Sequence, residues 1–288
     1  MLNRTLKEAL FYERLPDNKV RCLLCPQTCI ILPDKTGFCR VRQNKEGTLY
    51  SLIYAKITSL ALDPIEKKPL YHYHPGEYII SIGTRGCNLA CSFCQNWSIS
   101  QVNDAPVEEM SSEQIIQQAE RYKSFGIAYT YNEPFIWYEF VLDTAILAKK
   151  KGVENVLVTN GYINPEPLSK LLPYINAMNI DLKSIENEFY QKFCKGQLEP
   201  VLATIKRAHK TCHIELTNLI IPGLNDKEEN FIKLVDWVYE NLGPEVPLHF
   251  SRYFPCYKMD LPPTPIARLR RAEEIAREKL RYVYLGNV

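Results

Sequence analysis

The chain has 288 residues, of which 46% are hydrophobic and 24% are charged, and this composition is typical of a globular protein rather than a disordered or fibrous one. Its 35 basic and 33 acidic residues leave a net charge of +2, so no nucleic acid partner is expected. The first residues, MLNRTLKEALFYERL, lack the apolar segment of a secretory signal, and no apolar run of membrane-spanning length follows. We therefore expect a cytoplasmic protein with no membrane partner.

Residues 1–75 differ from the rest of the chain, because they combine four cysteines and several turn signals with only short apolar runs. They predict an N-terminal Cys-bearing segment and linker, followed by a core domain over residues 76–288. The stretch 60–76, rich in proline and tyrosine, is the expected linker or lid.

From residue 78 onward, β-rich runs alternate with helical patterns. The predicted strands are 78–84, 127–131, 155–160, 178–182, 214–221, 248–253 and a seventh candidate at 282–285. Between the first two runs, Ser111 and Gln114 form the capping-box pattern of a helix start. Repeated strand–helix units predict the α/β class with a parallel sheet, and six units predict a partial (β/α)6 TIM-like barrel.

The most specific motif follows the first predicted strand of this series. Cys87, Cys91 and Cys94 have the spacing C-x3-C-x2-C, in a loop at the carboxyl edge of the sheet, where parallel α/β proteins place their active sites. Three thiolates without a local fourth ligand suit a [4Fe–4S] cluster with one open iron, whereas structural zinc takes four ligands. The open iron can bind a small chelating molecule.

This motif, with Phe93 before its last cysteine, resembles the cluster loop of the radical SAM superfamily. More closely, the chain resembles the pyruvate formate-lyase activating enzyme-like group, and within it the branch called the AmmeMemoRadiSam system radical SAM enzyme. The segments that carry this resemblance are RCLLCP, TYNEP, LVTNGY, DLK, IIPGLND and HFSRYFPCYKM, and they extend over nearly the whole chain.

The resemblance implies a radical SAM core barrel whose Cys87, Cys91 and Cys94 bind a [4Fe–4S] cluster and whose second cofactor is S-adenosyl-L-methionine (SAM). It implies an oxidoreductase that reductively cleaves SAM to a 5′-deoxyadenosyl radical, which abstracts hydrogen from a small-molecule or protein substrate. A reductant such as flavodoxin or ferredoxin is the implied electron donor. No catalytic residue beyond the cofactor ligands is implied.

The resemblance also assigns SAM contacts to the polar ends of the second and third predicted strands. Asn132 and Glu133 replace the family's usual Gly-Gly-Glu turn, and they would accept hydrogen bonds from the SAM ammonium. Asn160 would contact cofactor or substrate. Capping of a neighbouring helix is the structural alternative for Glu133.

The ends of the later strands carry the remaining expected contacts. Asp181 and Lys183 project the same way by the strand period of two, and the resemblance places them near the SAM ribose or carboxylate. Pro222 and Gly223 would let bare backbone approach the adenine. Arg252 would bind a carboxylate group.

A second cysteine group has the spacing Cys22-x2-Cys25-x3-Cys29-x9-Cys39. Four thiolates over this length are a candidate second metal site, either closed zinc or an auxiliary Fe–S cluster. The resembling family carries a similar N-terminal pattern, and this pattern leaves the choice of metal open.

Two alternatives to the general radical SAM reaction remain. One is a glycyl-radical enzyme activase acting on a protein glycine, although the ferredoxin-like insert common in such activases does not follow Cys94. The other is a non-enzymatic scaffold that binds zinc or Fe–S centres. The remaining cysteines, Cys194, Cys212 and Cys256, lack motif spacing and are expected to pack as free thiols, with Cys256 the nearest to the predicted site.

Overall fold

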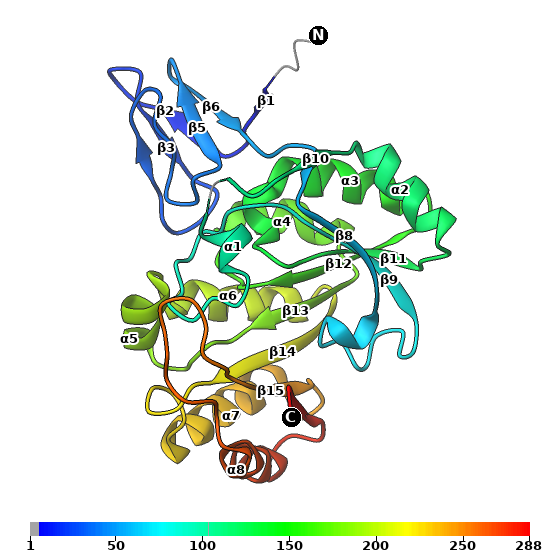
Figure 1. Ribbon diagram of the computed structural model, residues 1–288, viewed down its shortest axis with the longest axis vertical. Helices are drawn as coiled ribbons and strands as arrows, with labels where there is room; N and C mark the ends of the chain where they lie inside the picture. The colour runs from blue at the N-terminus through cyan, green and yellow to red at the C-terminus, as the bar shows by residue number, and fades with distance from the viewer. Residues whose placement is uncertain (1–5, 103) are drawn as a thin grey trace.

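The computed structural model describes residues 6–102 and 104–288, and within them the main sheet has eight strands (Figure 1). Strand β8 (Ser59–Pro64) is antiparallel to its neighbour, and the other strands pair in parallel and in chain order. The parallel strands are β9 (Tyr78–Gly83), β11 (Gly126–Tyr129), β12 (Glu154–Thr159), β13 (Ala177–Asp181), β14 (His213–Ile220), β15 (Leu248–Arg252) and β16 (Val283–Gly286). The predicted α/β class, the parallel sheet and the seventh candidate strand are thereby confirmed.

Helices connect consecutive parallel strands, as right-handed crossovers require. They are α2 (Ser112–Arg121), α3 (Tyr138–Lys150), α4 (Pro165–Leu171), α6 (Leu198–His209), α7 (Glu228–Leu242) and α8 (Ile266–Arg277). Helix α2 begins at the predicted capping box, in which the Ser111 side chain accepts from the Gln114 N–H and the Gln114 side chain accepts in return. None of the described helices combines the length and the apolar character that crossing a bilayer demands.

Shorter helical segments lie in the connections. They are η1 (Ile65–Lys67), α1 (Trp97–Ser100), η2 (Pro134–Trp137), η3 (Leu172–Tyr174), α5 (Asn187–Phe189) and the π-helical η4 (Tyr190–Cys194). Two of them matter for the site, since η2 follows the end of β11 and η4 follows β13. Both therefore start near the carboxyl edge of the sheet.

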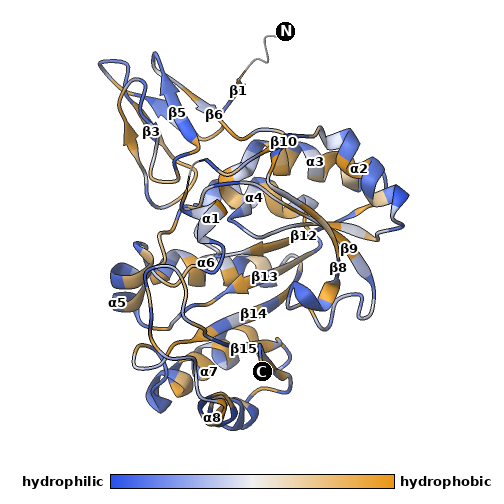
Figure 2. Cartoon of the chain, in the orientation of Figure 1, coloured by the Kyte–Doolittle hydropathy of each residue, from blue (hydrophilic) through white to orange (hydrophobic). Residues whose placement is uncertain are grey.

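Side chains on both faces of the sheet are buried, in two separate core clusters, and its strands are accordingly apolar. Ile80, Ile82, Leu157, Met178 and Ile180 are fully buried in one core cluster, and Figure 2 shows hydrophobic residues along β12 and β13. Burying each such side chain contributes roughly 1.5–3 kcal/mol. This packed core fixes the strand ends that carry the polar residues.

The N-terminal residues form a separate antiparallel module at one end of the molecule (Figure 1). One of its sheets has the order β1–β6–β5 and the other β2–β3–β4. The strands are β1 (Lys7–Glu8), β2 (Tyr12–Arg14), β3 (Val20–Cys22), β4 (Ile30–Ile31), β5 (Arg42–Lys45) and β6 (Thr48–Ser51). A short pair, β7 (Lys56–Ile57) with β10 (Glu108–Glu109), follows the module.

The stretch 60–76, expected as a linker or lid, divides into two parts. Its first residues belong to β8, which extends the main sheet beside β9. Its last residues cross the opposite end of the sheet from the cysteine loop, where the His72 N–H donates to Glu215 near the start of β14 (2.7 Å). The domain boundary after residue 75 stays a prediction.

Candidate functional site

The three cysteines of the C-x3-C-x2-C motif lie in the loop that follows β9, as predicted. The backbone of this loop is bonded to the segment around η4, because the Ala90 N–H donates to the Cys194 carbonyl (2.8 Å) and the Ser92 N–H to that of Phe193 (2.9 Å). On its other side the Lys258 N–H donates to the Ser92 carbonyl (3.0 Å). Connections after β13 and β15 therefore hold the loop in place.

The sulfur of Cys87 receives two hydrogen bonds, from the Leu89 N–H (3.4 Å) and from Asn160 Nδ2 (3.5 Å). Such bonds to a thiolate ligand tune the potential of an Fe–S cluster. Burial, with Glu133 and Cys91 nearby, raises the pKa of Cys87 well above its ordinary value, so metal binding there must displace a proton.

The thiols of Cys91 and Cys94 also lie close enough together for Cys91 to influence the pKa of Cys94. Burial and the neighbouring Cys91 raise the pKa of Cys94 to about 11. In the described residues, no three His, Cys, Asp or Glu side chains lie at the spacing of a single-ion site. A cubane binds each thiolate through a different iron atom, and three thiols on one loop with N–H donors to a sulfur fit that group.

Asn132 holds the start of the cysteine loop. Its Oδ1 accepts the Thr84 N–H (3.0 Å), and its Nδ2 donates to the Gly86 carbonyl (3.0 Å). The preceding Tyr131 adopts the left-handed conformation (φ 70°), which is uncommon for a non-glycine residue. The predicted cofactor residue thus bridges the end of β11 to the residues just before Cys87.

Glu133 and Asn160 form a buried unit beneath Cys87. The Glu133 carboxylate accepts from the Phe135 N–H (2.9 Å), Thr159 Oγ1 (2.7 Å) and the Asn160 N–H (2.8 Å). Burial raises the pKa of Glu133 to about 7, although these bonds favour ionisation. The carboxylate also caps η2, and its contact with SAM stays a prediction.

Asp181 and Lys183 form an ion pair at the end of β13 (2.8 Å). Burial would lower the pKa of Lys183, but Asp181, Cys91 and Cys194 raise it well above its ordinary value. The two side chains therefore lie on the same side of the chain at this strand end, as the strand period predicts.

The later strand ends are less closely connected to the loop. Gly223, which follows Pro222, is left-handed (φ 74°) and its N–H donates to Asp226 (2.9 Å); a side chain there would meet open space. Arg252 Nε donates to the Thr264 carbonyl (2.8 Å), and its guanidinium lies 4.9 Å from the Phe254 ring. These residues share the carboxyl edge with the cysteine loop.

Two further cysteines reach the loop. The side chain of the fully buried Cys194 contacts Cys91, and this contact is the largest cause of the raised Cys91 pKa. Cys256 Sγ lies 3.5 Å from the Cys94 carbonyl. The position of Cys256 just after β15 indicated this proximity, but nothing in the local sequence around Cys194 did.

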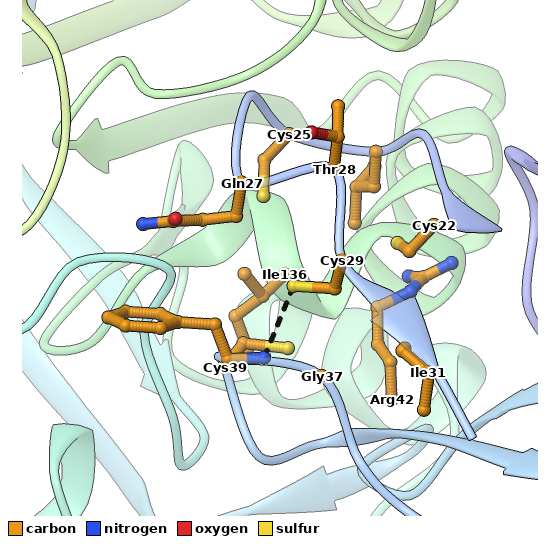
Figure 3. A pocket seen from close by; sticks show the side chains of 12 residues that line it. Cys22, Cys25, Gln27, Thr28, Cys29, Ile31, Gly37, Cys39, Arg42 and Ile136 are labelled. Carbon is orange, nitrogen blue, oxygen red and sulfur yellow. Dashed lines mark hydrogen bonds between the residues drawn. The ribbon is translucent and has the colours of Figure 1, made fainter. Parts of the chain in front are cut away.

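The second cysteine group lies in the N-terminal module. Cys22, Cys25, Cys29 and Cys39 line one small cavity, together with Arg42 and others (Figure 3). The sequence predicted that these four side chains would lie together, and the cavity brings them together.

Comparison with known proteins shows three kinds of similarity. A family model described as the radical SAM superfamily matches residues 81–235. An uncharacterized protein of Methanocaldococcus jannaschii is 50% identical over 98% of this chain and 86% of its own length. The pyruvate formate-lyase-activating enzyme of Clostridium pasteurianum is 24% identical, over 53% of this chain and 66% of its own length, so the match spans just under two thirds of that relative.

Two solved structures share the fold at low sequence identity. Streptococcus suis SuiB bound to S-adenosylmethionine has a TM-score of 0.56 and 17% identity, over 70% of this chain and 48% of SuiB. A radical SAM methyltransferase from Sphaerobacter thermophilus has a TM-score of 0.57 and 16% identity, over 74% of this chain and 67% of its own. At these identities the similarity concerns the fold alone.

Proposed function

The chain belongs to the radical SAM superfamily. We propose that it is an enzyme whose Cys87, Cys91 and Cys94 would hold a [4Fe–4S] cluster for the reductive cleavage of SAM, and that the resulting radical abstracts hydrogen from an organic substrate. When bound, the cluster supplies the electron that breaks the carbon–sulfur bond of SAM, which gives methionine and the 5′-deoxyadenosyl radical. The observation that carries this proposal is the loop of three thiols at the carboxyl edge, with Asn160 donating to the Cys87 sulfur (3.5 Å).

The residues of the chain would orient the cluster and exclude water from it. Leu89 N–H and Asn160 Nδ2 donate to Cys87, and the Cys194 side chain contacts Cys91. Glu133 holds the Asn160 backbone in place (2.8 Å). Three protein thiolates leave one iron of a cubane for SAM.

The SAM contacts expected at the strand ends are part of this proposal. Glu133 and Asn132 would accept hydrogen bonds from the SAM ammonium. The Glu133 carboxylate already accepts three hydrogen bonds, which leaves one of its lone pairs for this contact. The Asp181–Lys183 pair would face the ribose or carboxylate. In the same proposal, Pro222 and Gly223 border the adenine, and Arg252 binds a carboxylate group.

Residues 1–75 and 76–288 would act as an N-terminal Cys-bearing segment and a radical SAM core. Flavodoxin or ferredoxin would supply the electron, because the reaction consumes one from outside the chain. The substrate is a small molecule or a protein.

A glycyl-radical activase is the second candidate, favoured by the 24% identity to a pyruvate formate-lyase-activating enzyme over 53% of the chain. In that case the hydrogen donor would be a backbone glycine of another protein. Electron paramagnetic resonance of a co-expressed partner would show a glycyl radical, and a silent spectrum with each tested partner would count against this candidate.

The general reaction is tested by anaerobic reconstitution with iron, sulfide and dithionite, followed by chromatography for 5′-deoxyadenosine. The wild type should form it from SAM, and the variant with Cys87, Cys91 and Cys94 all changed to Ala should not. Cys212→Ser, directly before β14 and outside both cysteine groups, should keep the activity. A wild type that binds iron but forms no 5′-deoxyadenosine would refute the proposal.

A further inference from the structure

The N-terminal module holds a group of thiols that the reaction proposed above does not use. Cys22, Cys25, Cys29 and Cys39 line one cavity, and Figure 3 shows their sulfurs around its centre. All four are free thiols, and Cys22, Cys25 and Cys39 are buried. Four unpaired thiols around one cavity form a complete ligand set for a thiophilic metal.

Cys22 ends β3, and two tight turns carry or adjoin the other three thiols. In the first, the Thr28 N–H donates to the Cys25 carbonyl (3.0 Å), and Thr28 is left-handed (φ 42°). In the second, the Arg40 N–H donates to the Gly37 carbonyl (2.8 Å), and Arg40 is left-handed (φ 67°). Such backbone conformations are costly for residues other than glycine, and they persist where the surroundings hold them in place.

The backbone of the second turn is shaped around a sulfur atom of the first. The Phe38 N–H donates to Cys29 Sγ (3.3 Å), a bond that stabilises a thiolate ligand. A Cβ atom at Gly37 would stand 3.1 Å from Ile31 Cδ1 and 3.5 Å from Cys29 Sγ. The second turn therefore packs directly against the Cys29 thiol, and its tightest neighbour is Ile31.

The same two turns touch the loop of the radical SAM cluster. Gln27 Nε2 donates to the carbonyls of Asn88 (3.0 Å) and Lys195 (2.7 Å). At Gly86, a Cβ atom would stand only 2.8 Å from the Cys39 carbonyl oxygen. The residues on both sides of the first cluster cysteine therefore rest against the N-terminal cysteine group.

We propose that Cys22, Cys25, Cys29 and Cys39 bind one iron–sulfur cluster, which holds the Gln27 turn against the cluster loop. Within the described residues, no three of these thiols lie at the spacing of a single-ion site, so a cluster fits them better than a zinc ion. A cluster bound by these thiols would cross-link the two turns, so its binding free energy would become folding free energy of the module. The metal site in the N-terminal module does not depend on the proposed function. Only the effect of that site on the neighbouring radical SAM cluster rests on the proposed function.

The first test measures metal content in full-length protein purified without oxygen. The triple variant with Cys87, Cys91 and Cys94 changed to Ala should keep iron with sulfide by elemental analysis. Adding Cys25→Ser and Cys39→Ser should remove that metal, and adding Cys212→Ser instead should leave it bound. Retained iron with sulfide identifies the cluster, and retained zinc without iron would overturn the proposal.

A triple variant without metal would overturn the proposal, and this result is decisive even where the combined variant does not fold. Because the triple variant lacks the ligands of the radical SAM cluster, its metal content is unaffected by a failure of the proposed function.

The second test addresses the contact between the two sites. Gln27→Ala should retain the N-terminal metal, but its barrel iron should pass to a chelator about tenfold faster than in the wild type, as expected for loss of an outer-shell partner. Gln43→Ala is the matched control, because Gln43 Nε2 donates to the Asp34 carbonyl within the module (3.2 Å). Equal rates of iron loss in the two variants would show that Gln27 does not support the cluster loop.

Discussion

Glu133 links the end of β11 to the sulfur of Cys87 through a single intermediate residue. Its carboxylate fixes the Asn160 N–H, and Asn160 Nδ2 donates to Cys87 Sγ. The carboxylate is buried among donors from η2 and β12. A change at Glu133 therefore reaches a cluster ligand without any direct contact between the two side chains.

The pH dependence of stability should reveal this carboxylate. Burial raises the pKa of Glu133 from 4.5 to about 7, so the stability associated with its protonated form is complete below pH 4.5 and is lost as the pH rises through 7. The loss amounts to about 3 kcal/mol. The glutamine in Glu133→Gln is neutral at every pH, so the variant should not lose this stability. In urea unfolding, the free energy of unfolding of the variant minus that of the wild type should therefore rise by about 3 kcal/mol between pH 4.5 and 8.

The control for this measurement is Glu166→Gln, since the Glu166 side chain is exposed. This variant should follow the wild type across the whole pH range. A difference between wild type and Glu133→Gln that stays constant with pH would contradict the prediction.

The cysteine loop as an element depends on Gly86, which precedes its first cysteine. Gly86 is left-handed (φ 91°), and a Cβ atom there would stand 2.8 Å from both the Cys39 carbonyl oxygen and Val41 Cγ1. We predict that Gly86→Ala lowers the free energy of unfolding by about 3 kcal/mol, because it adds a backbone clash to left-handed strain. Gly152→Ala, left-handed but facing open space, should cost only about 1 kcal/mol.

Chemical denaturation of the two variants measures this difference. Equal costs would mean that the close approach between the loop and the N-terminal module is not required for stability.

A buried carboxylate, that of Glu215, links the N-terminal ends of β14 and β15, at the other end of the sheet from the cysteine loop. Glu215 accepts from His249 Nε2 (2.6 Å), His213 Nε2 (3.1 Å) and the His72 N–H (2.7 Å). These bonds join two strands to the segment that precedes β9. The barrel end away from the cysteine loop is therefore sealed by a polar cluster, not only by apolar packing.

Acid should weaken this closure. Burial would raise the pKa of Glu215, but bonds from His213, His249 and backbone N–H groups lower it from 4.5 to about 2. The resulting stability, about 3 kcal/mol, is present above pH 4.5 and is lost as the pH falls through 2. Glu215→Gln should be less stable than the wild type by about this amount at pH 7 in guanidinium, with the gap closing below pH 3.

Glu154→Gln is the control, because Glu154 on β12 also bonds to the segment that precedes β9, through Tyr73 and His74, but is partly exposed. We expect a loss below about 1 kcal/mol for it. A Glu215→Gln variant no less stable than this control at pH 7 would argue against the closure.

At the scale of elements, the sequence predicted the strands and helix starts that depend on neighbouring residues in the chain. The β-rich runs predicted the parallel strands, because strands buried on both faces need continuous apolar residues, and Ser111 predicted its helix start. Strand β8 was missed because Leu60 and Leu62 are exposed on it. The contacts of Gln27 with Asn88 and of Cys194 with Cys91 join distant segments, and such contacts leave no local pattern.

At the scale of the whole molecule, a buried ion pair joins the N-terminal module to the barrel. Arg42 on β5 and Glu139 on α3 are each 1% exposed and lie 2.9 Å apart. Glu139 also accepts the Leu10 N–H (2.8 Å), and Arg42 donates to the Leu10 carbonyl (2.6 Å). Arg42 also lines the four-cysteine cavity. The ion pair between module and barrel therefore lies directly beside the proposed metal centre.

The pair predicts how firmly the module is attached. Arg42→Met or Glu139→Leu leaves one buried charge without its partner, and each should lower the free energy of unfolding by about 3–5 kcal/mol. The double variant should lose less than either, since two apolar side chains of similar size replace the pair. Asp143→Ala on the same helix is the control, because its bond to Lys7 is partly exposed and contributes about 1 kcal/mol or less. Denaturation together with limited proteolysis of residues 6–51 measures both effects, and single variants as stable as Asp143→Ala would show that the module docks mainly through its apolar contacts.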